Sequence, residues 1–355
     1  WNVKSTSPAS ISGGSVSNVN NGVFVNNYDG YPSAGSNAPD GAHATVAGIA
    51  VSNCLRGLYV KDNTLSTHAP VSMALGSGVT VTGGTDGLVV ENASASVTSL
   101  SDVAFTGQSG KYIRLIANSG NLDATSATFA GQTGGSATLA QNFAIEDKIT
   151  HKIDDGALGY VSVKANHDFV TVNSFEAPAT TIASIQRGVN AASNGYTVNV
   201  AAGTYTDNVV VDQEVSILGA GQAMTFVQPL TSNPNCGGGG GGSLCAGGSN
   251  VMLVQADNVS IQQLTIDGNN PAISSGVTAG GSDIDARNGI ITNHNLGIYN
   301  NLLVNNVTVK NIFLRGIYAS TGGTFTFTNN TVDNVQADPG SIAMFNFGGS
   351  GSFTG

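Results

Sequence analysis

Short runs in which hydrophobic and polar residues alternate recur along the chain, and glycine and asparagine separate them. Hydrophobic residues stand two positions apart in these runs, as at Val209 and Val211 and at Val215 and Ile217. Residues two apart on a strand point to the same side, so the pattern predicts short strands with one buried face. Gly and Asn adopt positive φ most readily, which sharp turns between strands need. We therefore expect an all-β fold.

Four segments share one arrangement: "VSNVNNGVFVNN", "VSNCLRGLYVKDN", "GGTDGLVVENAS" and "VKNIFLRGIYAS". Each has Asn, Asp or Arg before Gly, and then three or four strand-forming residues. Gly22, Gly57 and Gly87 lie 35 and 30 residues apart, and spacings of this size are typical of solenoid repeats. We predict a parallel β-solenoid whose asparagines stack at equivalent turns. An antiparallel sandwich or barrel is the alternative, since it has similar strands and glycines.

One segment in mid-chain has a helical period instead. Thr181 is the expected N-cap, Ile182, Ile185 and Val189 fall at i, i+3 and i+7 on one apolar face, and Gly195 ends the segment. A solenoid exposes unpaired strands and core residues at its ends, and these need a cover. We expect a short amphipathic helix that caps the start of a new stack of coils.

The residues from Ile182 to Gly221, "IASIQRGVNAASNGYTVNVAAGTYTDNVVVDQEVSILGAG", carry a resemblance to a known family. They resemble the N-terminal segment of right-handed parallel β-helix (pectin-lyase-like) proteins. Pectin methylesterases, pectate-lyase-like proteins and very large bacterial secreted or surface proteins are among these. The likeness is close over this segment and general elsewhere. It implies a right-handed parallel β-helix, but the fold hosts many activities and does not identify one.

The residues before this helix have the character of a closing segment. Charged residues are scarce in the chain, at 10% of all residues, yet they gather between Phe143 and Val172. A polar segment that shields the last coil of a solenoid would have this composition. We expect two stacked partial modules: residues 1–176 hold the later coils and closing segment of one, and residues 177–355 hold the capping helix and early coils of the next.

Two of the three cysteines flank a glycine run, in "CGGGGGGSLC" from Cys236 to Cys245. Closing so flexible a loop with a disulfide would remove much unfolded-state entropy. We predict that the two are bonded, which would indicate an oxidising, extracellular or cell-surface setting. The alternative is a pair of free thiols. A zinc site lacks a second pair of ligands at metal spacing.

The charge balance limits the partners. The net charge of −10 argues against a nucleic-acid partner, which would require clustered Lys and Arg. No run of apolar residues is long enough for a membrane span. We therefore expect neither a nucleic-acid partner nor a membrane span.

The best acidic cluster is "GGSDIDARNG", with Asp283, Asp285 and Arg287. The two carboxylates at i and i+2 would share one side of a strand, close enough to couple or to hold a cation such as calcium. The simpler interpretation is a polar loop that Arg287 neutralises. The five histidines are scattered, and no metal-binding motif appears, so we assign no metal or other cofactor.

No catalytic residue can be assigned. The chain lacks the "QAVAL"-like and "DFLFG"-like stretches of pectin methylesterases and the "GHG" and "RIK"-like elements of polygalacturonases. We expect a structural protein of the bacterial cell surface or exterior, which associates with copies of itself end to end as a stalk, fibre or filament. The alternatives are a carbohydrate-active β-helix enzyme and an adhesin that binds surface glycans through exposed tyrosines such as Tyr28, Tyr31, Tyr299 and Tyr318.

Overall fold

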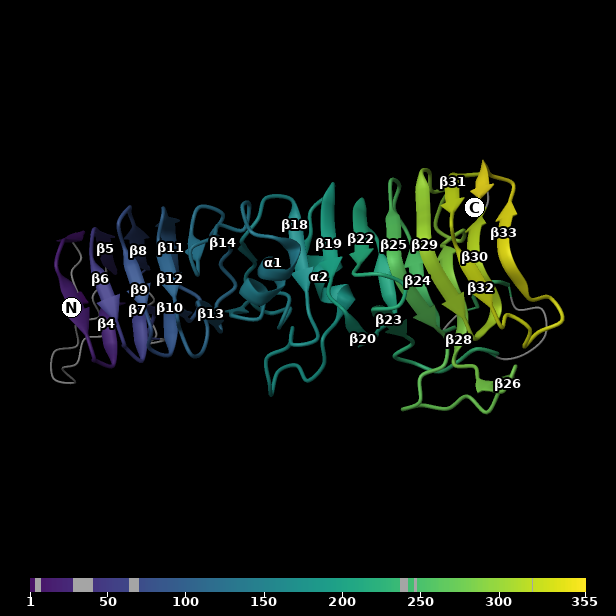
Figure 1. The fold of residues 1–355 in the computed structure, drawn as a ribbon, viewed down its shortest axis with the longest axis horizontal. Helices are drawn as coiled ribbons and strands as arrows, with labels where there is room; N and C mark the ends of the chain where they lie inside the picture. Colours follow the sequence, from purple (N-terminus) through teal and green to yellow (C-terminus); the bar gives the residue numbers. More distant parts are fainter. Residues whose placement is uncertain (4–7, 28–40, 64–69, 237–241, 246–247, 321) are drawn as a thin grey trace. The chain divides into compact units, whose positions relative to one another are not determined.

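The computed structural model describes residues 1–3, 8–27, 41–63, 70–236, 242–245, 248–320 and 322–355 (Figure 1). These residues form thirty-four strands and two helices, and only one pair of strands in the described ranges is antiparallel. The parallel all-β architecture is therefore confirmed, and the antiparallel sandwich or barrel is wrong. The chain divides into two compact units.

The first unit contains residues Trp1–Ala165 and Glu176–Thr180. The chain visits three parallel sheets in turn, so every third strand returns beside its predecessor. The first sheet consists of β1 (Asn2–Val3), β4 (Asn21–Asn26), β7 (Arg56–Lys61), β10 (Asp86–Glu91), β13 (Ile113–Ile116) and β16 (Ile149–Thr150). The second consists of β2 (Ala9–Ser12), β5 (Ala42–Ala47), β8 (Val71–Leu75) and β11 (Ala95–Leu100). The third consists of β3 (Ser15–Ser17), β6 (Ala50–Ser52), β9 (Thr80–Thr82), β12 (Ala104–Thr106) and β15 (Thr128–Phe129).

The core of this unit is a set of hydrophobic ladders. Val23, Leu58, Leu88 and Ile113 occupy equivalent positions of β4, β7, β10 and β13, and each is fully buried. Neighbouring strands lie about 4.8 Å apart, so each inward side chain packs on the one before it. The alternation read from the sequence thus positions one core residue above another.

The repeated glycines of the sequence pattern have a different role from the expected one. Gly22 and Gly57 are the second residues of β4 and β7, and neither has positive φ. A Cβ on Gly22 would lie 2.6 Å from the carbonyl oxygen of Gly57 and 2.6 Å from Cγ1 of Val51. The glycines are needed because the next coil approaches too closely for a side chain.

Asparagine does occupy the turns. Ten of the sixteen described non-glycine residues with positive φ are asparagines. Their side chains bond from coil to coil: in the second unit Asn301 Nδ2 donates to Asn258 Oδ1 at 2.8 Å, and Asn334 Nδ2 donates to Asn311 Oδ1 at 2.7 Å. The predicted stacking of asparagines is confirmed at these turns.

The segment expected to close the first module contains part of a helix that the sequence pattern did not predict. Helix α1 (Leu139–Glu146) begins at a capping box, in which Thr138 accepts from the backbone N–H of Gln141 and the Gln141 side chain accepts from that of Thr138. After it, β17 (Val161–Ser162) pairs with β14 (Leu122–Asp123).

The second unit contains residues Asn166–Phe175 and Thr181–Gly355. Its larger sheet runs through β18 (His167–Val170), β19 (Tyr196–Val200), β22 (Val215–Gly219), β25 (Ser260–Asp267), β29 (Leu302–Lys310), β31 (Thr324–Thr328) and β34 (Ser350–Thr354), with β20 (Gly203–Thr206), β23 (Thr225–Gln228) and β32 (Thr331–Asp333) beside it. Its second sheet consists of β21 (Val209–Val211), β24 (Asn250–Val254), β28 (Ala286–Thr292), β30 (Ile312–Ser320) and β33 (Ile342–Phe347). A small antiparallel hairpin joins β26 (Thr278–Ala279) and β27 (Ser282–Asp283).

The predicted capping helix is present but shorter than expected. Helix α2 spans Ile185–Ala191, and its N-cap is Ser184, whose side chain accepts from the N–H of Arg187 at 3.2 Å. The prediction of Thr181 as N-cap is therefore wrong. Ile182 precedes the helix and is 46% exposed, so it is not part of the buried face.

The buried face of α2 consists of Ile185, Gly188 and Val189. A Cβ on Gly188 would lie 2.5 Å from Val170 of β18 and 2.9 Å from Val198 of β19, so the helix rests directly on the inner residues of these strands. Gly195 lies beyond the C-cap in a turn with φ of 84°.

The boundary between the units is less simple than a division at residue 176. Strand β18 precedes the helix, yet it pairs in parallel with β19 from His167 to Val170. This pairing joins Asn166–Phe175 to the second unit, while Glu176–Thr180 packs with the first. Neither of the two described helices has the length and apolar character needed to cross a membrane.

Candidate functional site

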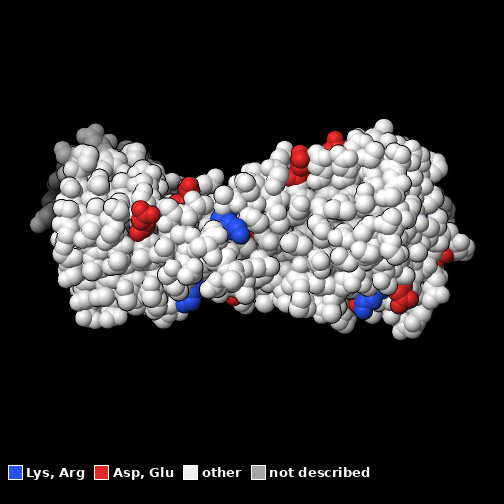
Figure 2. Space-filling model, turned by 45° about the horizontal axis from the view of Figure 1, so that its top comes forward, with Lys and Arg blue, Asp and Glu red and all other residues white. Residues whose placement is uncertain are grey.

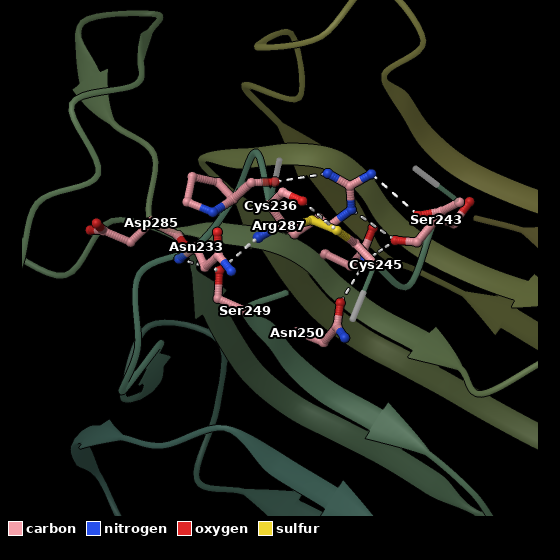
Figure 3. Close-up of a disulfide and its surroundings, with 11 residues drawn as sticks. Asn233, Cys236, Ser243, Cys245, Ser249, Asn250, Asp285 and Arg287 are labelled. Carbon is pink, nitrogen blue, oxygen red and sulfur yellow. Dashed lines mark hydrogen bonds between the residues drawn. A yellow bond between two sulfur atoms is a disulfide. The ribbon is translucent and has the colours of Figure 1, made fainter. Parts of the chain in front are cut away.

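Two residues of the predicted polar cluster, Asp285 and Arg287, lie in the same part of the second unit as the two cysteines (Figure 3). The connection from β23 to β24 contains Cys236 and Cys245, which an S–S bond joins. Five of the six glycines between them lie outside the described residues. The described loop residues Pro234, Gly242 and Ser243 surround the side chain of Arg287.

Arg287 is the centre of this arrangement. It lies on β28, is 5% exposed, and donates hydrogen bonds to three loop carbonyls: Nε to Ser243 at 3.0 Å, Nη1 to Pro234 at 2.9 Å and Nη2 to Gly242 at 3.3 Å. Its guanidinium carbon also lies 5.6 Å from the ring centroid of Phe313. Burial lowers the pKa of the Arg287 guanidinium. The side chain thus fixes the disulfide-closed loop to the sheet.

Asp285, two residues before Arg287, is fully buried. Its Oδ1 accepts from the Ser232 hydroxyl at 2.7 Å and its Oδ2 from the backbone N–H of Asn270 at 3.0 Å. Ser249 links the two sides of the site, because its hydroxyl donates to the Asp285 carbonyl and accepts from the N–H of Arg287. The carboxylate therefore ties two loops to the start of β28.

Asp283 lies in a different environment. It ends strand β27 of the hairpin and accepts from the hydroxyls of Ser274 and Ser275, and these bonds lower the pKa of its carboxyl. Its bonds and those of Asp285 go to separate partners: two serine hydroxyls for Asp283, and the Ser232 hydroxyl and the Asn270 backbone N–H for Asp285. Among the described residues, no three His, Cys, Asp or Glu side chains are grouped closely enough to hold a metal ion.

The same loop covers a hydrophobic ladder on the outer face of the sheet. Leu253, Ile291, Tyr318 and Phe345 occupy register positions of β24, β28, β30 and β33. Leu244, next to Cys245, packs on Ile291 and Tyr318. The disulfide, the Arg287 bonds and Leu244 therefore act together to hold one loop against one sheet.

The tyrosines considered for sugar contact do not form an exposed set. Tyr318 is buried and stacks on Phe345, with centroids 4.9 Å apart, and Tyr299 is half-buried. Tyr28 and Tyr31 lie outside the described residues.

Charged side chains are few on the face in Figure 2. Those on the strands of the first unit's three main sheets all lie on one sheet: Arg56, Lys61, Asp86, Glu91 and Arg114 belong to β7, β10 and β13. Glu91 accepts from the Tyr59 hydroxyl at 2.5 Å and from Lys61 Nζ at 2.6 Å. Burial raises the pKa of the Glu91 carboxyl, but these bonds outweigh it and hold the pKa below its ordinary value. Burial, together with Glu91, raises the pKa of Tyr59.

A second buried polar cluster was missed in the sequence, where His151 showed no obvious partner. His151 is fully buried, and its Nε2 lies 2.7 Å from Oε1 of Glu146, the last residue of α1. Its Nδ1 accepts from the backbone N–H of Val161 at 3.0 Å, and the backbone N–H of His151 donates to Asp154 Oδ2 at 2.9 Å. Glu146 and Asp154 are 3% and 2% exposed. No motif spacing indicates this cluster, because a helix end, a turn and a strand supply its members.

The geometry of both clusters is that of structural junctions whose polar groups bond to one another. The chain matches no known protein-family model, and no curated protein sequence matches it.

Proposed function

We propose that this chain is a right-handed parallel β-helix protein of the bacterial cell surface or exterior with a mechanical role. In this proposal its coils form a segment of a stalk, fibre or surface filament, and copies associate end to end. Right-handed winding is supported by the strong preference of parallel crossover connections for that hand. The bond between Cys236 and Cys245 supports an oxidising location.

The observation that carries the proposal is a half-exposed core residue on the last strand of the larger sheet. Val304, Phe327 and Phe353 form one inward ladder through β29, β31 and β34. Phe327 is 1% exposed because Phe353 covers it edge-on, with centroids 5.4 Å apart, whereas Phe353 itself is 49% exposed. A further coil would bury Phe353 as Phe353 buries Phe327.

The outer edges of β33 and β34 support the same association, since no described strand pairs with them. An unpaired edge in a parallel stack is a template for another parallel strand. We propose that the first coil of a second copy occupies it. The inward residues Ile11 and Val16 of that coil are half-buried, whereas their register partners Val46 and Val51 are fully buried. Such contacts are heterologous and do not close into a ring, so they extend into filaments.

The test compares wild-type protein with Phe353→Lys by sedimentation velocity over a concentration series and by negative-stain electron microscopy. Wild type should give growing oligomers and unbranched fibres, and Phe353→Lys should remain monomeric. Thr326→Lys is the control, because this substitution adds the same charge on the exposed face of β31 and should leave association intact. A wild-type monomer at all concentrations, or equal association of both variants, would refute the proposal.

A further inference from the structure

A cavity of about 110 Å³ lies in the first unit, between the end of strand β15 and helix α1. Its floor is formed by Tyr112, Phe129 and Ile145, which are all buried. An apolar cavity of about 150 Å³ can hold benzene. The cavity here is smaller, but exposed residues form its rim, so a ligand need not be wholly enclosed. The space therefore suits a single small ring.

The floor of the cavity is largely aromatic. The ring centroids of Tyr112 and Phe129 lie 5.4 Å apart with the planes inclined by 45°, and Phe105 stacks on Phe129 at 5.7 Å. Aromatic rings favour offset or inclined partners with centroids about 4.5–7 Å apart, because the negative face of one ring attracts the positive edge of another. An aromatic ligand would extend this cluster of rings. An aliphatic ring lacks that charge distribution and would only fill the space.

Two exposed glutamines on the rim supply hydrogen-bond donors. Gln141 Oε1 accepts from the backbone N–H of Thr138 at 2.8 Å, and Gln132 Oε1 accepts from the Ser136 hydroxyl at 3.2 Å. Only an oxygen can accept from a backbone N–H, so the orientation of the Gln141 amide is fixed and its NH₂ group stays available. A polar substituent of a ligand would therefore meet donors at the mouth of the cavity.

Small residues keep the rim open, and one of them occupies a position that ordinarily takes asparagine. Ala130 and Ala144 both line the cavity and are exposed. Ala130 and Gly131 have φ of 49° and 87° and form a two-residue turn, since Phe129 and Gln132 exchange backbone hydrogen bonds across it. Such turns favour Asn-Gly, because positive φ is unfavourable for alanine. The turn therefore does not explain the alanine, whereas an open cavity does.

We propose that this cavity binds a small aromatic molecule with one hydrogen-bond acceptor, such as an aryl ketone. The ring of the ligand packs on Tyr112 and Phe129, and its acceptor oxygen takes a hydrogen bond from the NH₂ group of Gln141. All residues that line the site belong to the first unit. Binding therefore does not depend on the proposed association of copies.

The test uses acetophenone, whose carbonyl accepts hydrogen bonds and donates none. Binding is followed by NMR of protein labelled with carbon-13 at the alanine methyl groups. The signals of Ala130 and Ala144 should shift with one dissociation constant of about 1 mM, which lies within the affinity range of so small a ligand. The signal of Ala44, in the core of β5, should stay in place. Absence of a saturable shift at Ala130 and Ala144 would overturn the proposal.

A second ligand tests the aromatic preference on the wild-type protein. Cyclohexyl methyl ketone has the same acceptor and a similar size, but its ring is aliphatic. It should bind at least about 3-fold more weakly than acetophenone, because it gains no ring–ring interaction with Tyr112 and Phe129. Equal or tighter binding of the aliphatic ketone would overturn the assignment of an aromatic ligand.

Two substitutions test the rim while they preserve its local structure. Gln141→Glu keeps the oxygen that accepts from Thr138, and glutamate suits this position of a capping box, but the NH₂ donor is lost. Ala130→Asn suits the turn and places a larger, polar side chain on the rim. Each variant should keep the wild-type melting temperature or exceed it, and each should weaken acetophenone binding about 3- to 10-fold at the Ala144 signal. Wild-type affinity in either variant would overturn the proposal.

Discussion

A Cβ on Gly57 would lie 2.5 Å from Cγ1 of Val81 in the next coil and 2.8 Å from the carbonyl oxygen of Gly87. Contacts this short can be relieved only if a backbone or a packed core side chain moves. The spacing between coils therefore depends on the absence of a side chain at this position. Gly22 and Gly87 meet neighbouring backbone at similar distances.

Substitution of Gly57 by alanine should destabilise the first unit. We expect a loss of about 1–3 kcal/mol in the free energy of unfolding, the usual cost of overpacking. Gly156→Ala is the control: an added Cβ there meets nothing within 4 Å, and the change should stay within about 0.5 kcal/mol. Urea denaturation measures both, and equal stability of the two variants would show that the coils do not approach as described.

Arg287→Lys should destabilise the second unit by about 1.5–3 kcal/mol, because a lysine cannot reach three carbonyls with a planar fork. Arg114→Lys, at a partly exposed position 3.8 Å from Asp86, should change stability by less than about 0.5 kcal/mol. Thermal or urea unfolding of the two variants measures this difference in stability.

Reduction of the bond between Cys236 and Cys245 should destabilise the protein by about 2–3 kcal/mol. The disulfide positions the carbonyls that Arg287 binds, so the effect of reduction should be smaller in Arg287→Lys than in wild type. The free energy of unfolding of wild type and of Arg287→Lys, each measured with and without reductant, gives the four values needed for this comparison. Strictly additive effects would mean that the loop and Arg287 are independent.

Asp285→Asn and Asp283→Asn should differ sharply. The buried carboxylate of Asp285 accepts from two donors, and an amide NH₂ facing either donor should cost about 1–3 kcal/mol. Asp283 lies on an exposed hairpin, and its variant should be close to wild type. Equal losses of stability in the two variants would contradict the difference in burial between the two carboxylates.

Glu91 predicts a pH dependence of the first unit. Its pKa is held below the ordinary value, so the folded state binds fewer protons than the unfolded state near that value. The stability it contributes is complete above the ordinary glutamate pKa and is lost as pH falls through the lower, folded-state pKa. Glu91→Gln should lower stability at pH 7 and reduce the acid-induced loss. An unchanged slope of stability against pH below 5 would contradict this.

Much of the fold could be predicted from the sequence because it depends on local period and turn chemistry. Alternation at positions such as Val215 and Ile217 predicted the strands, and Ile185 and Val189 marked the buried face of the helix. The N-cap was misassigned because Thr181 and Ser184 are both good capping residues, and tertiary contacts select between them: Ser184 also donates to Asp207 at 2.8 Å.

Less of the candidate site could be predicted from the sequence, because its contacts join segments that lie far apart along the chain. Asp283 and Asp285 are two residues apart, but the chain leaves the hairpin between them, and their hydrogen bonds go to different partners. Arg287 bonds to loop carbonyls about fifty residues upstream, and no side-chain pattern marks a carbonyl partner. The environment of His151 depends in the same way on the path of the backbone.

The most direct test of the central claim, a stack of parallel coils that extends from copy to copy, is X-ray fibre diffraction from aligned assemblies. We predict a sharp reflection at about 4.8 Å along the fibre axis, because the strands lie across that axis and the coils repeat along it. A 4.8 Å reflection perpendicular to the axis, or a protein that stays monomeric and yields no fibres, would contradict the claim.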